Sequence, residues 1–174
     1  MEKGFTHVYT GGGKGKTTAA LGLALRAAGA GLNSYIIQFM KEFPYSELNS
    51  LQRLNNLIEI DQCGGDDFVY KRVKPSKAEV AKVGKGLESA RLKMVSGAYN
   101  LIILDEVLVS IYFELLKESE VLEFIKSKPE NIELILTGRY ASNKIIEAAD
   151  LVTEMKEIKH YYQKGVLSRT GIEN

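Results

Sequence analysis

The residues best suited to chemistry lie in the stretch Thr10–Thr18, TGGGKGKTT. Its four glycines allow successive backbone N–H groups to point inward and surround an oxyanion. Lys16 can reach phosphate oxygens, Lys14 adds a second cation, and Thr17 can offer its hydroxyl to Mg²⁺. The common phosphate-loop pattern, G-x-x-x-x-G-K-[ST], would place its first glycine at Thr10. The stretch therefore predicts phosphate binding by a loop that departs from the usual spacing.

A second candidate feature is LIILDE, residues 101–106, in which four apolar residues precede Asp105 and Glu106. The apolar run predicts a buried strand, and open α/β sheets bind ligands at the carboxyl ends of their strands. Carboxylate oxygens suit Mg²⁺, which keeps water and nucleotide phosphates as its other ligands. Either feature alone could be a tight turn or a helix N-terminus. Together they predict a nucleotide site whose metal is held by Thr17, Glu106 and Asp105.

The elements that must position these groups are strands alternating with helices. Short apolar runs predict strands at residues 5–10, 34–40, 57–63, 101–106 and 132–139, and a last extended segment at 150–158. Helical periodicity predicts helices from residue 17, at 47–54, at 107–117, at 120–128 and at 143–149. Ser76 and Glu79 form a capping box that predicts the start of a further helix. Gly84 lies on the apolar side of that helix and is expected to permit close packing.

Length and composition set the class of protein. A chain of 174 residues suits one domain, residues 1–174, and a net charge of +1 gives no general attraction to nucleic acid or to a membrane surface. The single cysteine, Cys63, cannot form an internal disulfide. No apolar run reaches the roughly 18–20 residues that span a bilayer, and the N-terminus has no apolar signal core. These features predict a cytoplasmic protein, with a secreted domain that lacks disulfides as the alternative.

The chain resembles the ATP:corrinoid adenosyltransferases of cobalamin biosynthesis and salvage over nearly its whole length. The strings that carry the resemblance are VYTGGGKGKTTAALGLALRAAGAG, IIQFMK, LIILDE, LTGR, EAADLVTEM, IKH and GIE. That family has the same shortened glycine spacing, so the departure at Thr10 is typical of it. The expected fold class is α/β, a three-layer P-loop NTPase-like (RecA-like) domain. Its open, mostly parallel sheet with helices on both faces is also what alternating strands and helices predict.

The resemblance implies transfer of the 5′-deoxyadenosyl group of ATP to the Co(I) of a reduced corrinoid, with release of triphosphate. Because Co(I) is itself a strong nucleophile, the protein has to place C5′ and stabilise charge on the departing triphosphate. The implied catalytic residues are Lys16, Lys14 and Glu106, and Glu106 is preferred to Asp105 as a ligand of Mg²⁺. The residues implied to contact ATP are Gly11, Gly12, Gly13, Lys14, Gly15, Lys16, Thr17, Thr18 and Arg26.

The corrinoid side departs from the family, which usually carries Phe-x-Trp in the loop after its third strand. This chain has DFVYK there, with Phe68 and Tyr70, and it has no tryptophan. The two aromatics are expected to exclude water from the lower face of cobalt, and core packing is the alternative. Arg139 is either a polar contact in the site or a surface ion-pair residue. His160 is expected to be structural or superficial, because a ligand on cobalt would oppose its reduction.

The resemblance also implies a flavoprotein as electron donor and a homodimer, which is the commonest assembly in any case. Two other function classes stay open. A phosphoryl-transfer kinase or ATPase of the same fold would release ADP, and Glu106 could serve such an enzyme near the γ-phosphate. A non-catalytic module would bind nucleotide or corrinoid without turnover.

Overall fold

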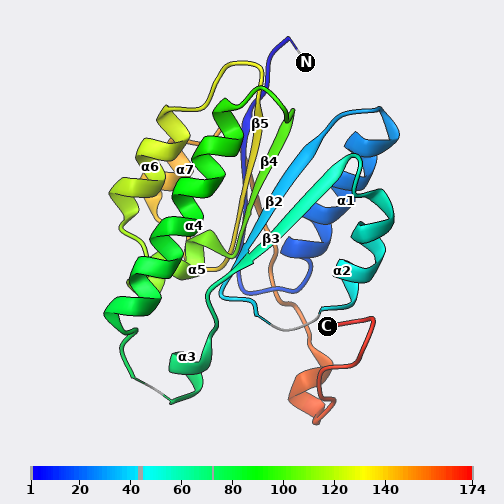
Figure 1. Ribbon diagram of the computed structural model, residues 1–174. Helices are drawn as coiled ribbons and strands as arrows, with labels where there is room; N and C mark the ends of the chain where they lie inside the picture. The colour runs from blue at the N-terminus through cyan, green and yellow to red at the C-terminus, as the bar shows by residue number, and fades with distance from the viewer. Residues whose placement is uncertain (1, 43–44, 72, 174) are drawn as a thin grey trace.

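The computed structural model describes residues 2–42, 45–71 and 73–173, with the side chains of Tyr70 and Lys71 excluded. Six parallel strands form one open sheet in the order β3-β2-β4-β5-β1-β6 (Figure 1). The strands are β1 (Thr6–Thr10), β2 (Ser34–Phe39), β3 (Ile58–Cys63), β4 (Leu101–Asp105), β5 (Glu133–Thr137) and β6 (Leu151–Glu154). The expected α/β class with an open parallel sheet is confirmed.

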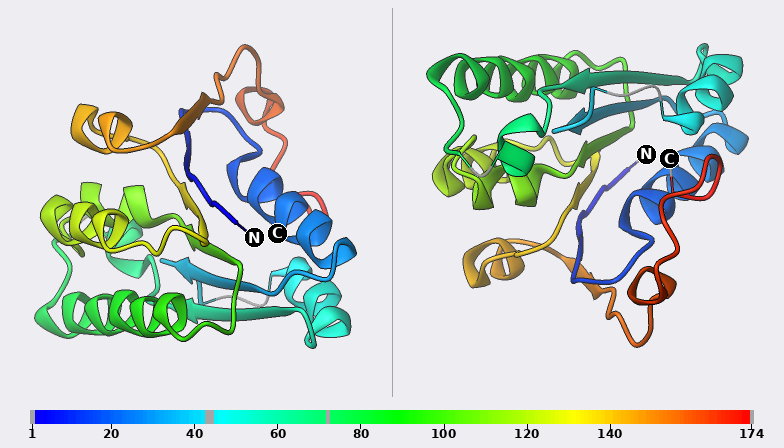
Figure 2. Two further views of the ribbon diagram at one scale, coloured as in Figure 1. Left: turned by 90° about the horizontal axis from the view of Figure 1, so that it is seen from above. Right: turned by 90° about the horizontal axis from the view of Figure 1, so that it is seen from below.

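Helices cover both faces of the sheet, so the molecule has three layers (Figure 2). On one face lie α1 (Lys16–Gly29), α2 (Ser46–Leu51) and the short 3-10 helix η1 (Gln52–Leu54). On the other face lie α4 (Lys77–Val95), α5 (Val107–Tyr112), α6 (Glu118–Lys126) and α7 (Asn143–Glu147). The five-residue α3 (Asp67–Lys71) lies beyond the carboxyl ends of the strands.

The two covered faces explain why β4 is apolar at four consecutive positions. Ile102 and Leu104 belong to the apolar cluster that includes residues of α4, α5 and α6. Leu101 and Ile103 belong to the cluster that includes residues of α1 and α2. Since successive strand residues point to opposite faces, a strand buried on both faces needs apolar side chains throughout. The first polar residue, Asp105, therefore falls at the carboxyl edge of the sheet.

The predicted capping box is confirmed at the start of α4. Glu79 N–H donates to Ser76 Oγ at 3.2 Å, and Ser76 N–H donates to the Glu79 carboxylate at 2.6 Å. The expectation for Gly84 was wrong, because a Cβ built there would meet no atom of the described residues within 4 Å. Gly86 is the glycine that permits close packing, since its Cβ would lie 2.5 Å from Cys63 Sγ.

The helix predicted over residues 107–117 is shorter than expected. It ends at Tyr112, and Glu114 adopts a left-handed φ of 61° that turns the chain. Leu115 N–H then donates to the carbonyl of Ser110 at 2.9 Å, and the Leu115 side chain is buried. Burial of apolar side chains after the turn thus overrides continued helical periodicity. No helix within the described ranges is long and apolar enough to cross a bilayer.

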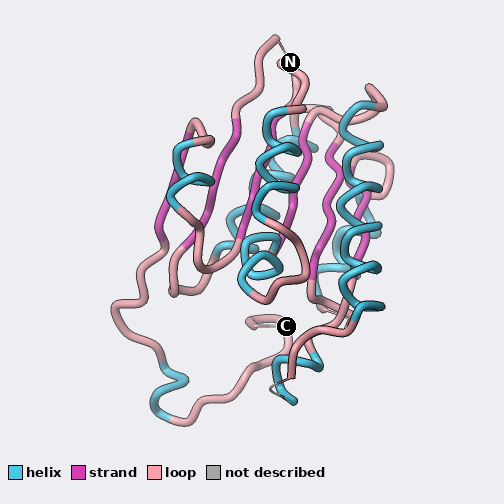
Figure 3. Tube along the Cα trace, turned by 90° about the vertical axis from the view of Figure 1, so that its left-hand side faces the viewer, coloured by secondary structure: helices cyan, strands magenta, loops and turns pink. Residues whose placement is uncertain are grey.

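The C-terminal segment beyond β6 passes beneath the carboxyl ends of the strands (Figure 3). It contains the 3-10 helix η2 (Tyr161–Lys164). This path brings residues near the end of the chain next to the loop that follows β1.

Candidate active site

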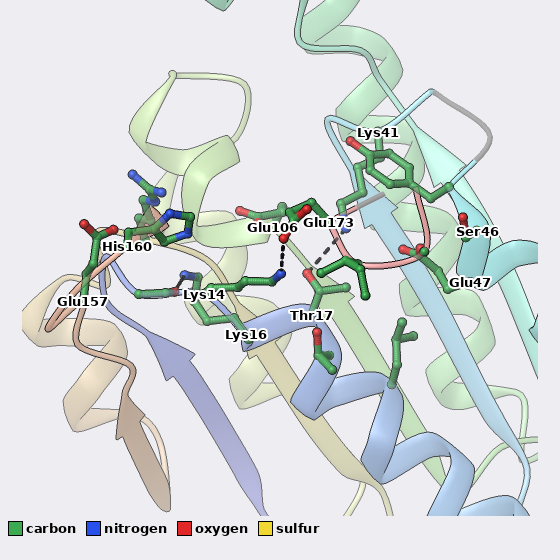
Figure 4. Close-up of a pocket in the computed structure, with 18 of the residues that line it drawn as sticks. Lys14, Lys16, Thr17, Lys41, Ser46, Glu47, Glu106, Glu157, His160 and Glu173 are labelled. Atoms are coloured by element: carbon green, nitrogen blue, oxygen red, sulfur yellow. Dashed lines mark hydrogen bonds and ion pairs between the residues drawn. The ribbon is translucent and has the colours of Figure 1, made fainter. Parts of the chain in front are cut away.

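A cavity of about 720 Å³ opens at the carboxyl edge of the sheet (Figure 4). Its volume is within the range of small-molecule sites in proteins, about 300–1,000 Å³. The loop after β1, the start of α1, the segment after β2 and the C-terminal segment all contribute to its wall. The residues that the glycine-rich stretch places in the wall are Gly12, Gly13, Lys14, Gly15, Lys16, Thr17 and Thr18.

Thr10 is not part of the loop. It is the last residue of β1, lies opposite Glu154 of β6 in the sheet, and is 8% exposed. The loop therefore begins at Gly11, which has a φ of +99°. Thr10 is not among the residues with a left-handed φ, so a threonine is compatible with this position.

The loop glycines differ in what they permit. A Cβ on Gly13 would lie 2.7 Å from the carbonyl oxygen of Met155, and the Gly13 N–H donates to that same oxygen at 2.7 Å. Gly15 has a left-handed φ of +115°, which favours glycine. Among the residues that the structure describes, none comes within 4 Å of a Cβ built on Gly12. The loop thus packs closely against the segment that follows β6 at Gly13, whereas a side chain could be accommodated at Gly12.

Lys16 is buried against the loop. Its Nζ donates to the carbonyls of Gly11 at 2.9 Å and Gly13 at 2.8 Å. Burial lowers the pKa of Lys16, with Glu106 opposing that shift. Lys16 is also the first residue of the 14-residue helix α1, whose N-terminus favours anions. The cation and the helix end therefore act on the same part of the cavity.

Asp105 is the centre of a buried hydrogen-bond network. Its Oδ1 accepts from the hydroxyls of Thr17 at 2.9 Å and Thr137 at 2.6 Å. Its Oδ2 accepts from Lys41 Nζ at 2.8 Å and Gln38 Nε2 at 3.3 Å. The carboxylate is 1% exposed and does not line the cavity. Asp105 therefore holds the start of α1 to β2, β4 and β5.

Glu106 lies in the cavity wall and has an unusual backbone. Its φ of 60° is left-handed, and its N–H donates to Thr137 Oγ1 at 2.9 Å. Burial and the neighbouring Asp105 raise the pKa of Glu106, while Lys41 and Lys16 oppose the shift. Left-handed non-glycine residues held by their surroundings are concentrated at functional sites. The left-handed turn lets adjacent carboxylates take different positions, one buried and one in the cavity.

The donor set suits Mg²⁺ with few protein ligands. A hydroxyl has one hydrogen and two lone pairs, so Thr17 can donate to Asp105 and still offer an oxygen to a cation. Glu106 supplies the carboxylate that lines the cavity. No group of three or more His, Cys, Asp or Glu side chains suited to a metal is present in the described part of the chain. A cation there would complete its shell with phosphate oxygens and water, as Mg²⁺ commonly does.

Lys41 is the functional candidate that sequence reasoning missed. Its side chain is 12% exposed, lines the cavity, and lies 3.4 Å from Thr17 Oγ1. Burial opposes its charge, but the carboxylates of Asp105, Glu106 and Glu47 outweigh burial and raise the pKa of Lys41. The only sequence signal was its position just after the strand in IIQFMK. Its relation to Asp105, 64 positions away, is visible only in the fold.

Of the other residues considered for the site, some line the cavity and one does not. Lys14, Arg139 and His160 line the cavity, and His160 Nδ1 also accepts from Tyr162 N–H at 3.1 Å. Arg26 lies in the last turn of α1, about 15 Å along the helix from Lys16 at 1.5 Å per residue, and is not among the lining residues. The structure therefore brings the phosphate-loop residues, Glu106 and Arg139 together but leaves Arg26 apart.

The aromatic pair proposed for the corrinoid side is described only in part. Phe68 is 3% exposed and packs edge-on against Phe113, with ring centroids 5.6 Å apart. It belongs to the apolar cluster on the α4 side of the sheet. The side chain of Tyr70 lies outside the described residues. In this conformation Phe68 has the environment of a core residue.

Comparison with known proteins agrees with these features. Residues 2–174 match the family described as "ATP:corrinoid adenosyltransferase BtuR/CobO/CobP". The chain is 31% identical over 173 residues to the corrinoid adenosyltransferase of Escherichia coli K12, covering 99% of this chain and 86% of that protein. It is 36% identical over 183 residues to an uncharacterized protein of Nostoc sp. strain PCC 7120, covering 98% of this chain and 48% of that protein. It therefore spans about half the length of that cyanobacterial relative.

A solved structure supports the fold. The KaiC-like protein of Pyrococcus horikoshii aligns with a TM-score of 0.61 at 19% identity, covering 98% of this chain and 76% of that one. At that identity the likeness concerns the fold alone. The family match over residues 2–174 reaches further, and this chain belongs to the ATP:corrinoid adenosyltransferase family.

Proposed function

We propose that this protein transfers the 5′-deoxyadenosyl group of ATP to the Co(I) of a reduced corrinoid and releases triphosphate. The observation that carries the proposal is the convergence of Lys16, Thr17 and Glu106 on one cavity in a chain of this family. Small-molecule ATP and corrinoid are the proposed substrates, and Mg²⁺ is the proposed cofactor. The natural corrinoid is either cobalamin or an earlier precursor such as cobyrinic acid diamide.

The reaction makes one bond and breaks one. The electron pair of Co(I) forms the cobalt–carbon bond to C5′, and cobalt becomes formally Co(III). The C5′–oxygen bond to triphosphate breaks, and triphosphate leaves with that electron pair. Because the nucleophile belongs to the substrate, the protein needs no nucleophilic side chain. Its task is to hold C5′ in line with cobalt and to stabilise charge on the leaving group.

The groups around the cavity are suited to the leaving group. Lys16, the loop N–H groups and the N-terminus of α1 offer positive charge where triphosphate would lie. Lys14 and Arg139 add cations to the same wall. Bound Mg²⁺ would neutralise further charge on the phosphate oxygens. Thr17 and Glu106 are its proposed ligands, and Asp105 orients the Thr17 hydroxyl by accepting a hydrogen bond from it.

The corrinoid site is proposed at the same edge of the sheet. Phe68 belongs to α3, which lies beyond the carboxyl ends of the strands, and Tyr70 follows in the same helix. We propose that this part of α3 forms the wall beneath the macrocycle. Arg26 stays a proposed nucleotide contact. A cytoplasmic homodimer supplied with electrons by a flavoprotein is proposed from the resemblance to the family.

The test is an anaerobic assay with MgATP and chemically reduced cobalamin that follows both products. We expect a light-sensitive alkylcobalamin in the visible spectrum and an equal amount of triphosphate. Lys16→Ala is the control and should lose both products. ADP and phosphate without change at cobalt would contradict the proposal and indicate a phosphoryl-transfer enzyme. Corrinoid binding without either product would indicate a binding module.

A further inference from the structure

The C-terminal segment reaches back to the phosphate loop. Lys14 Nζ lies 2.7 Å from Glu173 Oε1 and 3.0 Å from the hydroxyl of Tyr161, residues that are 159 and 147 positions away in the chain. Lys14 and Glu173 both line the cavity, and Figure 4 shows the Lys14 ammonium directed at Glu173. A cation expected to contact ATP is thus paired with a carboxylate of the chain itself.

Glu173 is held by several donors besides Lys14. The Arg169 N–H donates to Oε2 at 2.8 Å, and its guanidinium donates to Oε2 at 3.2 Å and to Oε1 at 3.1 Å. The Tyr161 hydroxyl also donates to Oε1. Arg169 and Lys14 both lie over the Tyr161 ring, 4.8 Å and 5.8 Å from its centroid. Arg169, Lys14 and Tyr161 together lower the pKa of the Glu173 carboxyl well below its usual range.

The two lysines of the loop are held in different ways. Lys16 donates to backbone carbonyls of Gly11 and Gly13, which form part of the loop. Lys14 is held by the carboxylate of Glu173, which belongs to the C-terminal segment that follows the last strand. A terminal phosphate presents the same kind of acceptor as a carboxylate, with more charge and one more oxygen. Triphosphate can therefore replace Glu173 on Lys14 without changing the type of contact.

We propose that residues 160–173 form a strap in which Glu173 holds the place of the terminal phosphate of ATP. Binding of ATP exchanges the carboxylate for phosphate on Lys14 and frees the strap. AMP lacks the β- and γ-phosphates that make the exchange, so it binds without moving the strap, and the strap weakens the binding of triphosphates alone. The inference rests on the proposed function only in that the cavity takes a nucleoside triphosphate, and it involves no step of adenosyl transfer.

The test compares ATP and AMP binding to Glu173→Gln by calorimetry. The substitution keeps the side-chain shape and removes the competing charge. We expect ATP to bind about 1.5- to fivefold more tightly, the range for release of an exposed ion pair, and AMP to bind unchanged. Glu157→Gln is the matched control, because Glu157 lines the same cavity but accepts from Gln163 at 2.8 Å. It removes the same charge without freeing Lys14.

A second measurement follows the strap directly. Hydrogen exchange at the Arg169 amide, which donates to Glu173, should become faster when ATP is added and not when AMP is added. Equal weakening of ATP and AMP binding in Glu173→Gln would overturn the proposal in favour of a structural role. Equal tightening of ATP binding in Glu173→Gln and Glu157→Gln would also overturn the proposal, because the effect would then come from the net charge of the cavity.

These outcomes are separable from the adenosyltransferase assay. The expected ATP-to-AMP shift in a protein that makes no alkylcobalamin would refute the proposed function and leave the strap intact. Normal alkylcobalamin formation with unchanged ATP affinity in Glu173→Gln would refute the strap and leave the function.

Discussion

Replacing Asp105 and Glu106 one at a time should separate two roles that are adjacent in the chain. In Asp105→Asn the carbonyl oxygen can still accept from Lys41 and Gln38. The new amide can donate to the hydroxyls of Thr17 and Thr137, which can rotate to accept. Shape and most hydrogen bonds are therefore kept. The loss is the negative charge beside the Lys41 ammonium, whose side chain is only 12% exposed.

The expected loss in the free energy of unfolding comes from the Lys41 ammonium, which no longer faces the charge of Asp105. Removing one partner of a buried ion pair costs about 3–5 kcal/mol, and we expect the lower end because the hydrogen bonds survive. For a chain of 174 residues this lowers Tm by about 6–12 °C. The protein should still fold, since domains of this kind have stabilities of about 5–15 kcal/mol. The double variant Asp105→Asn/Lys41→Met should recover most of the loss, because no uncompensated ammonium is left.

Glu106→Gln should behave in the opposite way. Burial and Asp105 raise the pKa of Glu106, so the folded protein holds this proton more tightly than the unfolded chain does. The stability contribution of Glu106 falls as pH rises from about 4.5, its ordinary pKa, through the raised value. The glutamine variant should therefore be more stable than the wild type at neutral pH. It should also lose Mg²⁺-dependent ATP binding.

The assay is urea denaturation of both variants at pH 7, with the wild type and Glu106→Gln repeated toward pH 4. The stability gap between those two proteins should close as pH falls. Nucleotide binding is measured by calorimetry with and without Mg²⁺. A loss below about 1 kcal/mol in Asp105→Asn, together with a larger loss in Glu106→Gln, would refute the division of roles. So would a metal dependence of ATP binding that survives Glu106→Gln.

Three further substitutions test the loop and the core. Gly13→Ala should weaken ATP binding by roughly tenfold in calorimetry, because its Cβ would lie 2.7 Å from the Met155 carbonyl oxygen and would break a 2.7 Å hydrogen bond. Gly12→Ala, with open space at its Cβ, is the control, and equal effects would contradict the steric argument. Lys16→Met should weaken ATP binding between about tenfold and a hundredfold in equilibrium dialysis, since hydrogen bonds to charged groups contribute about 1.5–3 kcal/mol. An unchanged affinity would show that Lys16 does not contact the nucleotide. Phe68→Ala should lower the free energy of unfolding by about 3–5 kcal/mol in urea, and an unchanged value would favour a corrinoid-facing role over packing.

Local patterns in the sequence determined the architecture. Four apolar residues before Asp105 predicted a strand buried on both faces, because side chains alternate across a sheet. Ser76 and Glu79 predicted the start of α4, since a capping box acts between residues three apart. The glycine-rich stretch between a strand and a helix predicted the phosphate-loop context. Each of these rules acts over a few residues, so spacing alone was sufficient.

Local patterns did less well where packing decided the outcome. Periodicity could not show that α5 ends at Tyr112, because the turn at Glu114 depends on burial of the leucines that follow. Nor could it show that Gly86 rather than Gly84 meets Cys63, since that depends on how α4 lies against β3. Nor could it show that Phe68 is a packed residue, because its partner Phe113 follows α5 and is distant in the chain.

Only the tertiary structure assigned roles within the site. Asp105 and Glu106 are neighbours of the same chemical type, and their different positions follow from Thr17, Lys41 and the left-handed turn at Glu106. The partner of Lys14 comes from the other end of the chain, 159 positions away. The carboxyl ends of parallel strands meet at one edge, so distant segments converge there, and no local spacing records which side chains will touch.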